Sequence, residues 1–358
     1  MRVVISGGGT GGHLSPALAV GEELKRMRPD TELLFVGTKA GLDQQFLSRS
    51  GFAYELLDVG GVAGHGAREV PIALLKMAKA IIRARALLKS WGPELVVGVG
   101  GYASMPAAVG ALSLRIPLLL MEQNTRPGLT NRVLARFARR ICVAFEDSLP
   151  LLPQFKVQVT GNPVRFAPVH KLRPQADRFS ILVLGGSSGA HRLNIGALKA
   201  FEILNKAVIN LKIVHQTGTA DEGLVRSGYQ QAAIEAEVVP FIYAMAEAFA
   251  QADLVVARAG AMTVSEVALA GKPSVLVPYP FHRDRQQEHN ARTLERQGAA
   301  IIVTDDDQLG DNLARVIREL INDRSRLESM AQAARRAAKP DAASAIARAC
   351  LEIVQEAA

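Results

Sequence analysis

Short apolar runs alternate with longer amphipathic segments along most of this 358-residue chain. The first run is Val3–Ile5, and a similar run, Ile181–Leu184, begins the second half. The runs that follow them are residues 33–36, 95–99, 117–121, 140–144, 212–215, 254–257, 274–278 and 300–303. Nearly unbroken apolar strands that alternate with helices are typical of parallel sheets covered by helices on both faces. The pattern predicts an α/β protein with two doubly wound domains, a number that also suits the chain length.

A proline-rich stretch near the middle of the chain predicts where the two domains join. It extends from Gly161-Asn162-Pro163 to Arg173-Pro174. The first domain would then cover residues 1–163 and the second residues 164–340. Ligands of doubly wound sheets bind beyond the carboxyl ends of the strands, so two facing domains would form a cleft between them.

Two glycine-rich loops align without a gap, and each follows the first strand of its half. They are Gly7–His13 and Gly185–His191. Glycines allow backbone N–H groups and the start of a helix to approach an anion closely. The first loop also matches the dinucleotide fingerprint, but that fingerprint needs an acid at the end of the second strand, and Phe35–Lys39 contains none. We interpret the loops as anion-binding rather than as a nicotinamide or flavin site; a tight turn without a ligand is the alternative.

Composition narrows the class of protein further. The two cysteines, Cys142 and Cys350, allow at most one disulfide bridge and favour a reducing, cytoplasmic setting. The seven histidines lack the spacing of metal ligands, so we expect no metal site. Residues 95–114 carry no charge, but glycines and a proline lie among them, which indicates a strand, a turn and a helix rather than a membrane span.

Basic residues are concentrated in part of the first half of the chain. Residues 60–141 hold 12 basic and 3 acidic side chains, and the whole chain has a formal charge of +8. Such a patch favours an anionic partner, either nucleic acid or phospholipid. An aromatic content of 5% and the absence of a stacking module argue against nucleic acid.

An amphipathic segment, Ile72–Arg85, is the candidate for membrane contact. At helical spacing one stripe contains Leu74, Met77 and Ile81. The basic residues beside or opposite this stripe are Lys76, Lys79, Arg83 and Arg85. A helix of this kind would lie on an anionic bilayer without crossing it; the alternative is that the stripe belongs to the core.

Two polar segments in the second half suggest a nucleotide-sugar site. Arg258–Glu266 follows an apolar run and begins a helix, whose N–H groups could bind a diphosphate. Glu266, expected in the first turn, could accept hydrogen bonds from ribose, or could only stabilise the helix. Asp284–Asn290 carries amides that suit sugar hydroxyls, although a solvated helix start is equally consistent with it. We interpret Asp305–Asp307 as a cap or a solvated turn.

Taken in order, several motifs resemble one family. They are Gly7–His13, Gly100-Gly101-Tyr102, Glu122-Gln123-Asn124, Gly161–Arg165, Gly185-Gly186-Ser187, Arg258–Glu266 and Asp284–Gln287. This set resembles the bacterial N-acetylglucosaminyltransferases of peptidoglycan synthesis that convert lipid I to lipid II, and it extends over essentially the whole chain. The resemblance implies the two-domain GT-B fold, with residues 341–358 packing back on an acceptor and membrane domain and with residues 164–340 forming a UDP-sugar donor domain. It also implies an inverting transfer from UDP-N-acetylglucosamine to the 4-hydroxyl of the muramyl sugar of lipid I, at the cytoplasmic face of the plasma membrane and without a cofactor.

Carried over to matching positions, the resemblance implies roles for individual residues. The residues implied for the donor are Thr10, Gly11, Gly12, Asn124, Arg165, Ser187, Ile242, Ala261, Met262, Thr263, Val264, Ser265, Glu266 and Gln287. His13 would be the general base, and Gly100, Gly101 and Tyr102 would lie on the acceptor side. The chain departs from the family at Ser188 and His191, where we expect glutamine and arginine, so any contact made by those two side chains is in doubt.

Two other classes of function remain open at this stage. One is a related enzyme, either a transferase with another acceptor, such as diacylglycerol, or a UDP-sugar epimerase. The other is a catalytically silent subunit that binds a nucleotide sugar. The presence of both His13 and Glu266 argues against the silent subunit.

Overall fold

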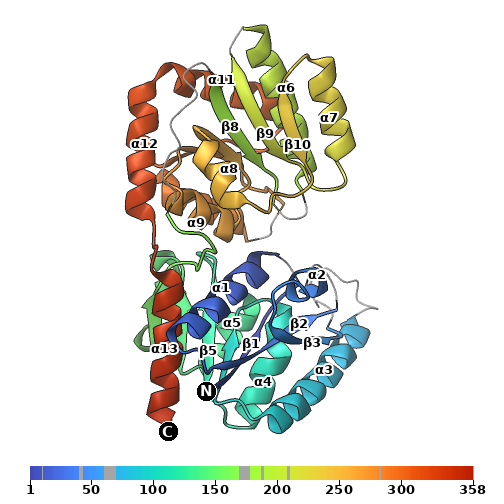
Figure 1. Cartoon of the computed structure of the whole chain (residues 1–358), viewed down its shortest axis with the longest axis vertical. Helices are drawn as coiled ribbons and strands as arrows, with labels where there is room; N and C mark the ends of the chain where they lie inside the picture. The colour runs from blue at the N-terminus through green and yellow to red at the C-terminus, as the bar shows by residue number, and fades with distance from the viewer. Residues whose placement is uncertain are drawn as a thin grey trace. The chain divides into compact units, whose positions relative to one another are not determined.

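The chain consists of two compact units, seen in a computed structural model that describes residues 1–9, 11–39, 43–59, 70–168, 178–186, 189–207, 210–281 and 284–357. The first unit contains Met1–Arg165 together with Pro340–Ala358, and the second contains Phe166–Lys339 (Figure 1). Each unit has its own parallel sheet, so the predicted α/β class with two doubly wound domains is confirmed.

The first unit is built on a seven-stranded parallel sheet in the order β3-β2-β1-β4-β5-β6-β7. Its strands are β1 (Arg2–Ser6), β2 (Glu32–Thr38), β3 (Ala53–Leu57), β4 (Leu95–Gly98), β5 (Leu118–Glu122), β6 (Arg140–Val143) and β7 (Val157–Val159). Its helices are α1 (Gly11–Met27), α2 (Asp43–Leu47), α3 (Val70–Trp91), α4 (Met105–Ser113), α5 (Leu129–Leu134) and α13 (Ala342–Ala357), with 3₁₀ turns η1 (Tyr102–Ser104), η2 (Glu146–Leu151) and η3 (Gln154–Lys156).

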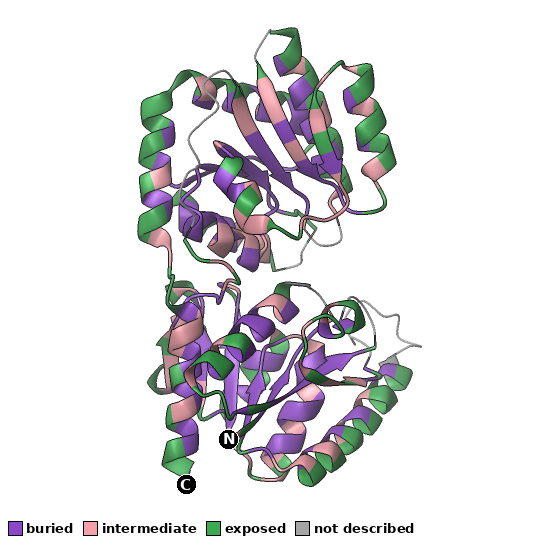
Figure 2. Cartoon of the chain, in the orientation of Figure 1, coloured by how far each residue is buried: buried purple, intermediate pink, exposed green. Residues whose placement is uncertain are grey.

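Helices cover both faces of this sheet because successive residues of each central strand point to opposite sides. Val3 and Ile5 pack with α1 and α13, whereas Val4 packs with α3, α4 and α5. Figure 2 shows the central strands buried and much of the outer face of α3 exposed. The uncharged stretch 95–114 forms β4 and α4, as predicted, and no helix in the described part of the chain is long and apolar enough to cross a membrane.

The second unit has a six-stranded parallel sheet in the order β10-β9-β8-β11-β12-β13. Its strands are β8 (Phe179–Leu184), β9 (Leu211–Gln216), β10 (Ala236–Val239), β11 (Leu254–Ala257), β12 (Ser274–Leu276) and β13 (Ala300–Ile302). Its helices are α6 (His191–Lys206), α7 (Glu222–Gln231), α8 (Met245–Gln251), α9 (Ala261–Leu269), α10 (Gln286–Glu295), α11 (Leu309–Asn322) and α12 (Arg324–Ala337).

Strand order reverses once in each sheet. From β1 the chain moves outward to β2 and β3, and then returns to β4 on the other side of β1. In the second unit the chain moves from β8 outward to β9 and β10, and then returns to β11 on the other side of β8. The loops that follow these strand pairs diverge at the reversal, and this is where open α/β sheets bind ligands. The glycine loop 7–9 and Gly100–Tyr102 follow the first pair, and the glycine loop 185–189 and Arg258–Gly260 follow the second.

Candidate active site

A buried carboxylate holds the glycine loop of the first unit. The N–H of Gly9 donates to both carboxylate oxygens of Asp43, at 2.8 and 3.0 Å, and the N–H of Thr38 donates to Oδ2 at 2.8 Å. A Cβ at Gly8 would lie only 1.8 Å from Oδ2, so a side chain there would displace the carboxylate. Burial raises the pKa of Asp43, although the N–H donors of Thr38 and Gly9 oppose that shift. Thr10 lies outside the described residues.

The imidazole of His13 lies against the backbone of the loop after β4. His13 is the third residue of α1, which begins at Gly11 and includes Gly12. A Cβ at Gly101 would lie 3.3 Å from Cε1 of His13, and one at Gly100 would lie 3.5 Å from Cδ2. Both glycines have positive φ angles, 93° at Gly100 and 71° at Gly101, which favour glycine. The absence of side chains at these two positions therefore allows the ring to approach the loop.

His13 is neutral at pH 7, because burial lowers its pKa to about 4. A neutral imidazole has the lone pair that a general base needs. Tyr102 directly follows Gly101, and its hydroxyl lies against the glycine loop of the first unit. A Cβ at Gly9 would lie 2.9 Å from this hydroxyl. Burial and the negative charge of Asp43 both raise the pKa of Tyr102, so its hydroxyl stays protonated.

Glu122 organises the loop that carries Asn124. Its Oε1 accepts from the N–H of Asn124 at 3.0 Å, and its Oε2 accepts from the N–H of Gly128 and from Nδ2 of Asn131, both at 2.9 Å. The amide of Gln123 is buried and has no hydrogen-bond partner among the described residues. A Cβ at Gly100 would lie 3.4 Å from the Gln123 Oε1 and 3.3 Å from the Asn131 Nδ2. The loops after β4 and β5 therefore meet close to His13.

In the second unit, the glycine loop between β8 and α6 packs against the end of β9. Gly189 has a φ of 79°, and a Cβ there would lie 2.3 Å from the carbonyl oxygen of Thr217. Nδ2 of Asn194 donates to the same carbonyl oxygen at 2.9 Å. His191, the first residue of α6, contacts Oδ1 of Asp221 through Nδ1 at 2.9 Å. Ser187 and Ser188 lie outside the described residues.

Most of the remaining donor residues suggested by the sequence belong to α9. Ala261, Met262, Thr263, Val264 and Ser265 form its first half, after Gly260. The start of a helix directs the N–H groups of its first turn away from the helix, where they can bind an anion. The Ser265 hydroxyl donates back to the carbonyl oxygen of Ala261 at 3.0 Å.

Glu266 lies deeper in α9 than predicted. It is the sixth residue of the helix that begins at Ala261 and belongs to the second turn, whereas the sequence suggested the first turn. Burial raises the pKa of Glu266 to about 7. No described protein group donates a hydrogen bond to its carboxylate.

Three other predicted donor residues lie apart from α9 in the sequence. In α10, Oε1 of Gln287 accepts from the N–H of Tyr279 at 2.9 Å, which holds this side chain at the end of β12. Ile242 lies half-buried between β10 and α8. Arg165 belongs to the first unit, where its NH2 pairs with Glu22 at 2.6 Å.

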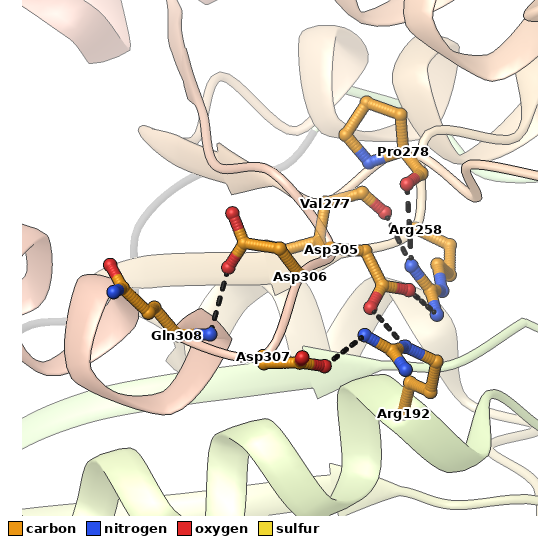
Figure 3. A network of polar contacts seen from close by, with 8 residues as sticks. All are labelled: Arg192, Arg258, Val277, Pro278, Asp305, Asp306, Asp307 and Gln308. Carbon is orange, nitrogen blue, oxygen red and sulfur yellow. Dashed lines mark hydrogen bonds and ion pairs between the residues drawn. The ribbon is translucent and has the colours of Figure 1, made fainter.

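Asp305 is not a cap or a solvated residue, contrary to the prediction from the sequence. It is buried, and its two oxygens pair with Arg258 at 2.7 Å and with Arg192 at 2.6 Å (Figure 3). Asp306 and Asp307 are exposed, and Oδ1 of Asp306 accepts from the N–H of Gln308 at 2.9 Å, as expected of a turn. The difference arises because the partners of Asp305 lie far away in the sequence.

The predicted membrane stripe coincides only partly with the exposed face of α3. Leu74 is exposed and Ile81 is partly exposed, but Met77 packs against the core. The side chains of Ile72, Leu74, Leu75 and Ile82 each expose more than half of their surface. The basic residues Lys76, Lys79, Arg83 and Arg85 are all exposed. Lys76 and Arg83 lie 3.7 and 3.9 Å from the exposed acids Asp58 and Glu55.

The described residues contain no group of three or more histidine, cysteine or acidic side chains that could hold a metal ion. Cys142 and Cys350 are buried free thiols in the core of the first unit. Burial raises the pKa of both thiols, to about 12 for Cys142, so neither is a reactive thiolate at neutral pH.

Comparison with known proteins covers nearly the whole chain. Residues 3–143 match the N-terminal domain of glycosyltransferase family 28, and residues 180–346 match the C-terminal domain of the same family. A relative from Geobacter sulfurreducens is 40% identical over 352 residues, which are 97% of each chain. It is named UDP-N-acetylglucosamine--N-acetylmuramyl-(pentapeptide) pyrophosphoryl-undecaprenol N-acetylglucosamine transferase.

Two solved structures are similar to this one to different degrees. The crystal structure of MurG from Acinetobacter baumannii has a TM-score of 0.78 at 32% identity, and the match covers 99% of each chain. A putative UDP-N-acetylglucosamine 2-epimerase from Listeria monocytogenes has a TM-score of 0.72 at 15% identity, over 99% of this chain and 97% of the other. The second likeness concerns the fold alone.

Proposed function

We propose a function from one premise: this chain belongs to glycosyltransferase family 28, whose two domains it matches in order. The proposed reaction moves N-acetylglucosamine from UDP-N-acetylglucosamine to the 4-hydroxyl of the muramyl sugar of lipid I, with inversion at the anomeric carbon. The observation that carries it is the close approach of the His13 imidazole to the backbone of Gly100 and Gly101, where the strand order of the first sheet reverses.

His13 is the proposed general base. The acceptor oxygen attacks the anomeric carbon from the face opposite UDP, the bond to UDP breaks, and its electron pair leaves with the diphosphate. The acceptor hydroxyl becomes strongly acidic as its oxygen forms the new bond, so an imidazole with a pKa of about 4 can still take the proton. Tyr102, which stays protonated, is a proposed hydrogen-bond donor to the acceptor.

The second unit is proposed to bind the donor. Backbone N–H groups of the loop 185–189 and of the first turn of α9 would stabilise the negative charge that develops on the leaving diphosphate. Glu266 would accept hydrogen bonds from the ribose hydroxyls, and the amide of Gln287 would contact the sugar. The carbonyl oxygen of Gln287 is already bonded to Tyr279, which leaves its NH2 group for the ligand. Arg165 is a weaker candidate for donor binding than the sequence alone suggested, because its guanidinium is already paired with Glu22.

Two apolar surfaces of the first unit support binding to an anionic membrane. The first, called the α3 surface, consists of Ile72, Leu74, Leu75 and Ile82. The second, called the α5 surface, consists of Leu129, Val133, Phe137, Leu151 and Phe155, and each of these side chains is more than half exposed. Helices α3 and α5 pack on the same face of the sheet. Exposed Arg132 and Arg136 add positive charge beside the α5 surface.

We therefore propose that the protein acts as a peripheral enzyme at the cytoplasmic face of the plasma membrane, where its lipid acceptor would be available. Apolar side chains surrounded by basic ones bind a bilayer surface through burial and charge together.

The test is transfer of labelled N-acetylglucosamine from UDP-N-acetylglucosamine to a lipid I analogue by the wild type and by His13→Ala. Removal of a general base is expected to lower kcat by roughly 10²-fold to 10⁴-fold. Transfer with little loss in His13→Ala would remove His13 from this role, and no transfer by the wild type would overturn the proposed reaction.

A further inference from the structure

One buried carboxylate joins three loops at the carboxyl edge of the second sheet. Asp305 follows β13 and pairs through Oδ2 with NH2 of Arg258, which directly follows β11, at 2.7 Å (Figure 3). NH1 of Arg258 donates to the carbonyl oxygens of Val277 and Pro278, after β12, at 3.1 and 3.4 Å. The guanidinium of Arg258 and the carboxylate of Asp305 are almost completely buried, with 8% and 0% of their side-chain surface exposed.

The second oxygen of Asp305 reaches another element. Oδ1 accepts from Nε of Arg192 at 2.6 Å, and Arg192 is the second residue of α6, three positions after Gly189. Arg258 stands two positions before Gly260, the residue that precedes α9. A single carboxylate therefore connects the beginning of α6, just after Gly189, with the start of α9, and the donor diphosphate is assigned to the backbone beside these two helix starts.

We propose that Asp305 is a positioning residue for the nucleotide-sugar diphosphate: it fixes the spacing between the beginning of α6, just after Gly189, and the first turn of α9. This inference rests on the proposed function, because it assumes that both segments bind the donor. Backbone N–H groups bind a diphosphate well only when they are held in position beforehand, since the energy needed to order them is otherwise lost from binding.

Asparagine at position 305 cannot replace the carboxylate in this arrangement. Its carbonyl oxygen can accept from one guanidinium, but its NH2 group would then face the other one, donor against donor. The buried Arg258 would also lose its only anionic partner among the described residues. We expect Asp305→Asn to raise the Kd for UDP-N-acetylglucosamine about 10-fold to 100-fold, as misplacement of binding groups commonly does.

A second variant keeps the test decisive if Asp305→Asn does not fold. Arg192→Gln breaks only the link to α6, and the buried pair of Arg258 and Asp305 stays intact. Because Arg192 is 41% exposed, this variant should fold normally. Its KM for the nucleotide sugar should rise several-fold, while its KM for the lipid acceptor and its Tm stay unchanged. Arg192→Lys keeps a cation beside Asp305 and should restore most of the affinity.

Asp307→Asn is the matched control. It removes one negative charge from the same turn, but Asp307 is fully exposed and lies 3.6 Å from NH2 of Arg192. If the charge alone mattered, the variants at 305 and 307 would weaken donor binding equally, and the inference would be wrong. It would also be wrong if Arg192→Gln changed the KM values of donor and acceptor alike. Failure of the wild type to bind UDP-N-acetylglucosamine would instead overturn the proposed function.

Discussion

Glu266 should make the affinity for the nucleotide sugar depend on pH. Burial raises its pKa to about 7, so the carboxyl group is partly protonated in the free protein at neutral pH. If ribose hydroxyls donate to the carboxylate, ligand binding selects the ionised form and releases a proton. The sign is therefore definite: affinity rises as the pH increases through 7 and then becomes constant.

The size of the effect follows from the ionised fraction. One pH unit below its pKa, a carboxyl group is ionised in about one molecule in eleven, and one unit above it in about ten in eleven. The Kd for UDP-N-acetylglucosamine should thus be about 10-fold higher at pH 6 than at pH 8. Because the pKa of His13 is about 4, protonation of that residue contributes little over this range.

Calorimetry over pH 5.5 to 8.5 measures both the affinity and the proton released, if buffers with different ionisation enthalpies are compared. UDP-N-acetylglucosamine is the proper ligand, because the terminal phosphate of UDP would itself titrate near pH 6. Glu266→Gln should bind more weakly and without pH dependence, whereas Glu237→Gln, at an exposed site in the same unit, should behave as the wild type. A wild-type Kd that is equal at pH 6 and pH 8, with no proton released, would refute the assignment of Glu266.

Three further outcomes follow from the first unit. Gly101→Ala and Gly51→Ala both place a side chain at a positive φ and should each lose about 1–2 kcal/mol of stability, but only Gly101→Ala should abolish most of the transfer, because only Gly101 has His13 as a neighbour. Urea denaturation measures the loss of stability, and initial rates measure the loss of transfer. Equal transfer rates in the two variants would contradict a functional contact between Gly101 and His13. Asp43→Asn should lower the free energy of unfolding by about 1–3 kcal/mol, since the amide oxygen replaces only one carboxylate oxygen and the NH2 group in the other place would face the N–H of Gly9 or of Thr38, donor against donor, while exposed Asp58→Asn should not. Leu75→Ser with Ile82→Ser should weaken flotation with anionic liposomes, whereas Leu224→Ser, an exposed site in the second unit, should not; unchanged flotation would remove the α3 surface from the interface.

The hydrophobic pattern predicts the buried strands well and misses three at the sheet edges. β3, β7 and β10 each form the edge of a sheet, and their residues are largely exposed or only partly buried. An edge strand is paired on one side only and often has a solvated face, so it needs no continuous apolar run. The central strands, buried on both faces, are apolar along nearly their whole length and are recognised for that reason.

The polar interior of the site is much harder to predict than the sheets. Asp43 lies four residues beyond Lys39, outside the strand end where the dinucleotide fingerprint has its acid, and its carboxylate accepts a hydrogen bond from the glycine loop at Gly9. Asp305 looks like part of an acidic turn, because Arg192 and Arg258 reach it only after the chain has folded. His13 and Gly101 are far apart in sequence, and no periodicity reports that the ring packs on that glycine.

The residue at which a helix begins is also difficult to predict from the sequence. α1 begins at Gly11, and Pro16 lies inside the helix, although proline is commonest at the first helical position. α9 begins at Ala261, so Glu266 lies in the second turn and not in the first, where the sequence suggested it. The local signals for a helix start tolerate shifts of a few residues, and packing on the sheet selects among them.

The most direct test of the proposed reaction is an acceptor-dependence experiment followed by NMR of the anomeric protons. The protein is incubated with UDP-N-acetylglucosamine in the presence and in the absence of a lipid I analogue. A lipid I transferase predicts that the nucleotide sugar is consumed only with the acceptor, and that UDP and a β-linked N-acetylglucosamine on the 4-position of the muramyl sugar appear in equal amounts. Conversion of the nucleotide sugar without the acceptor, or no new glycosidic bond when lipid I is present, would contradict this function.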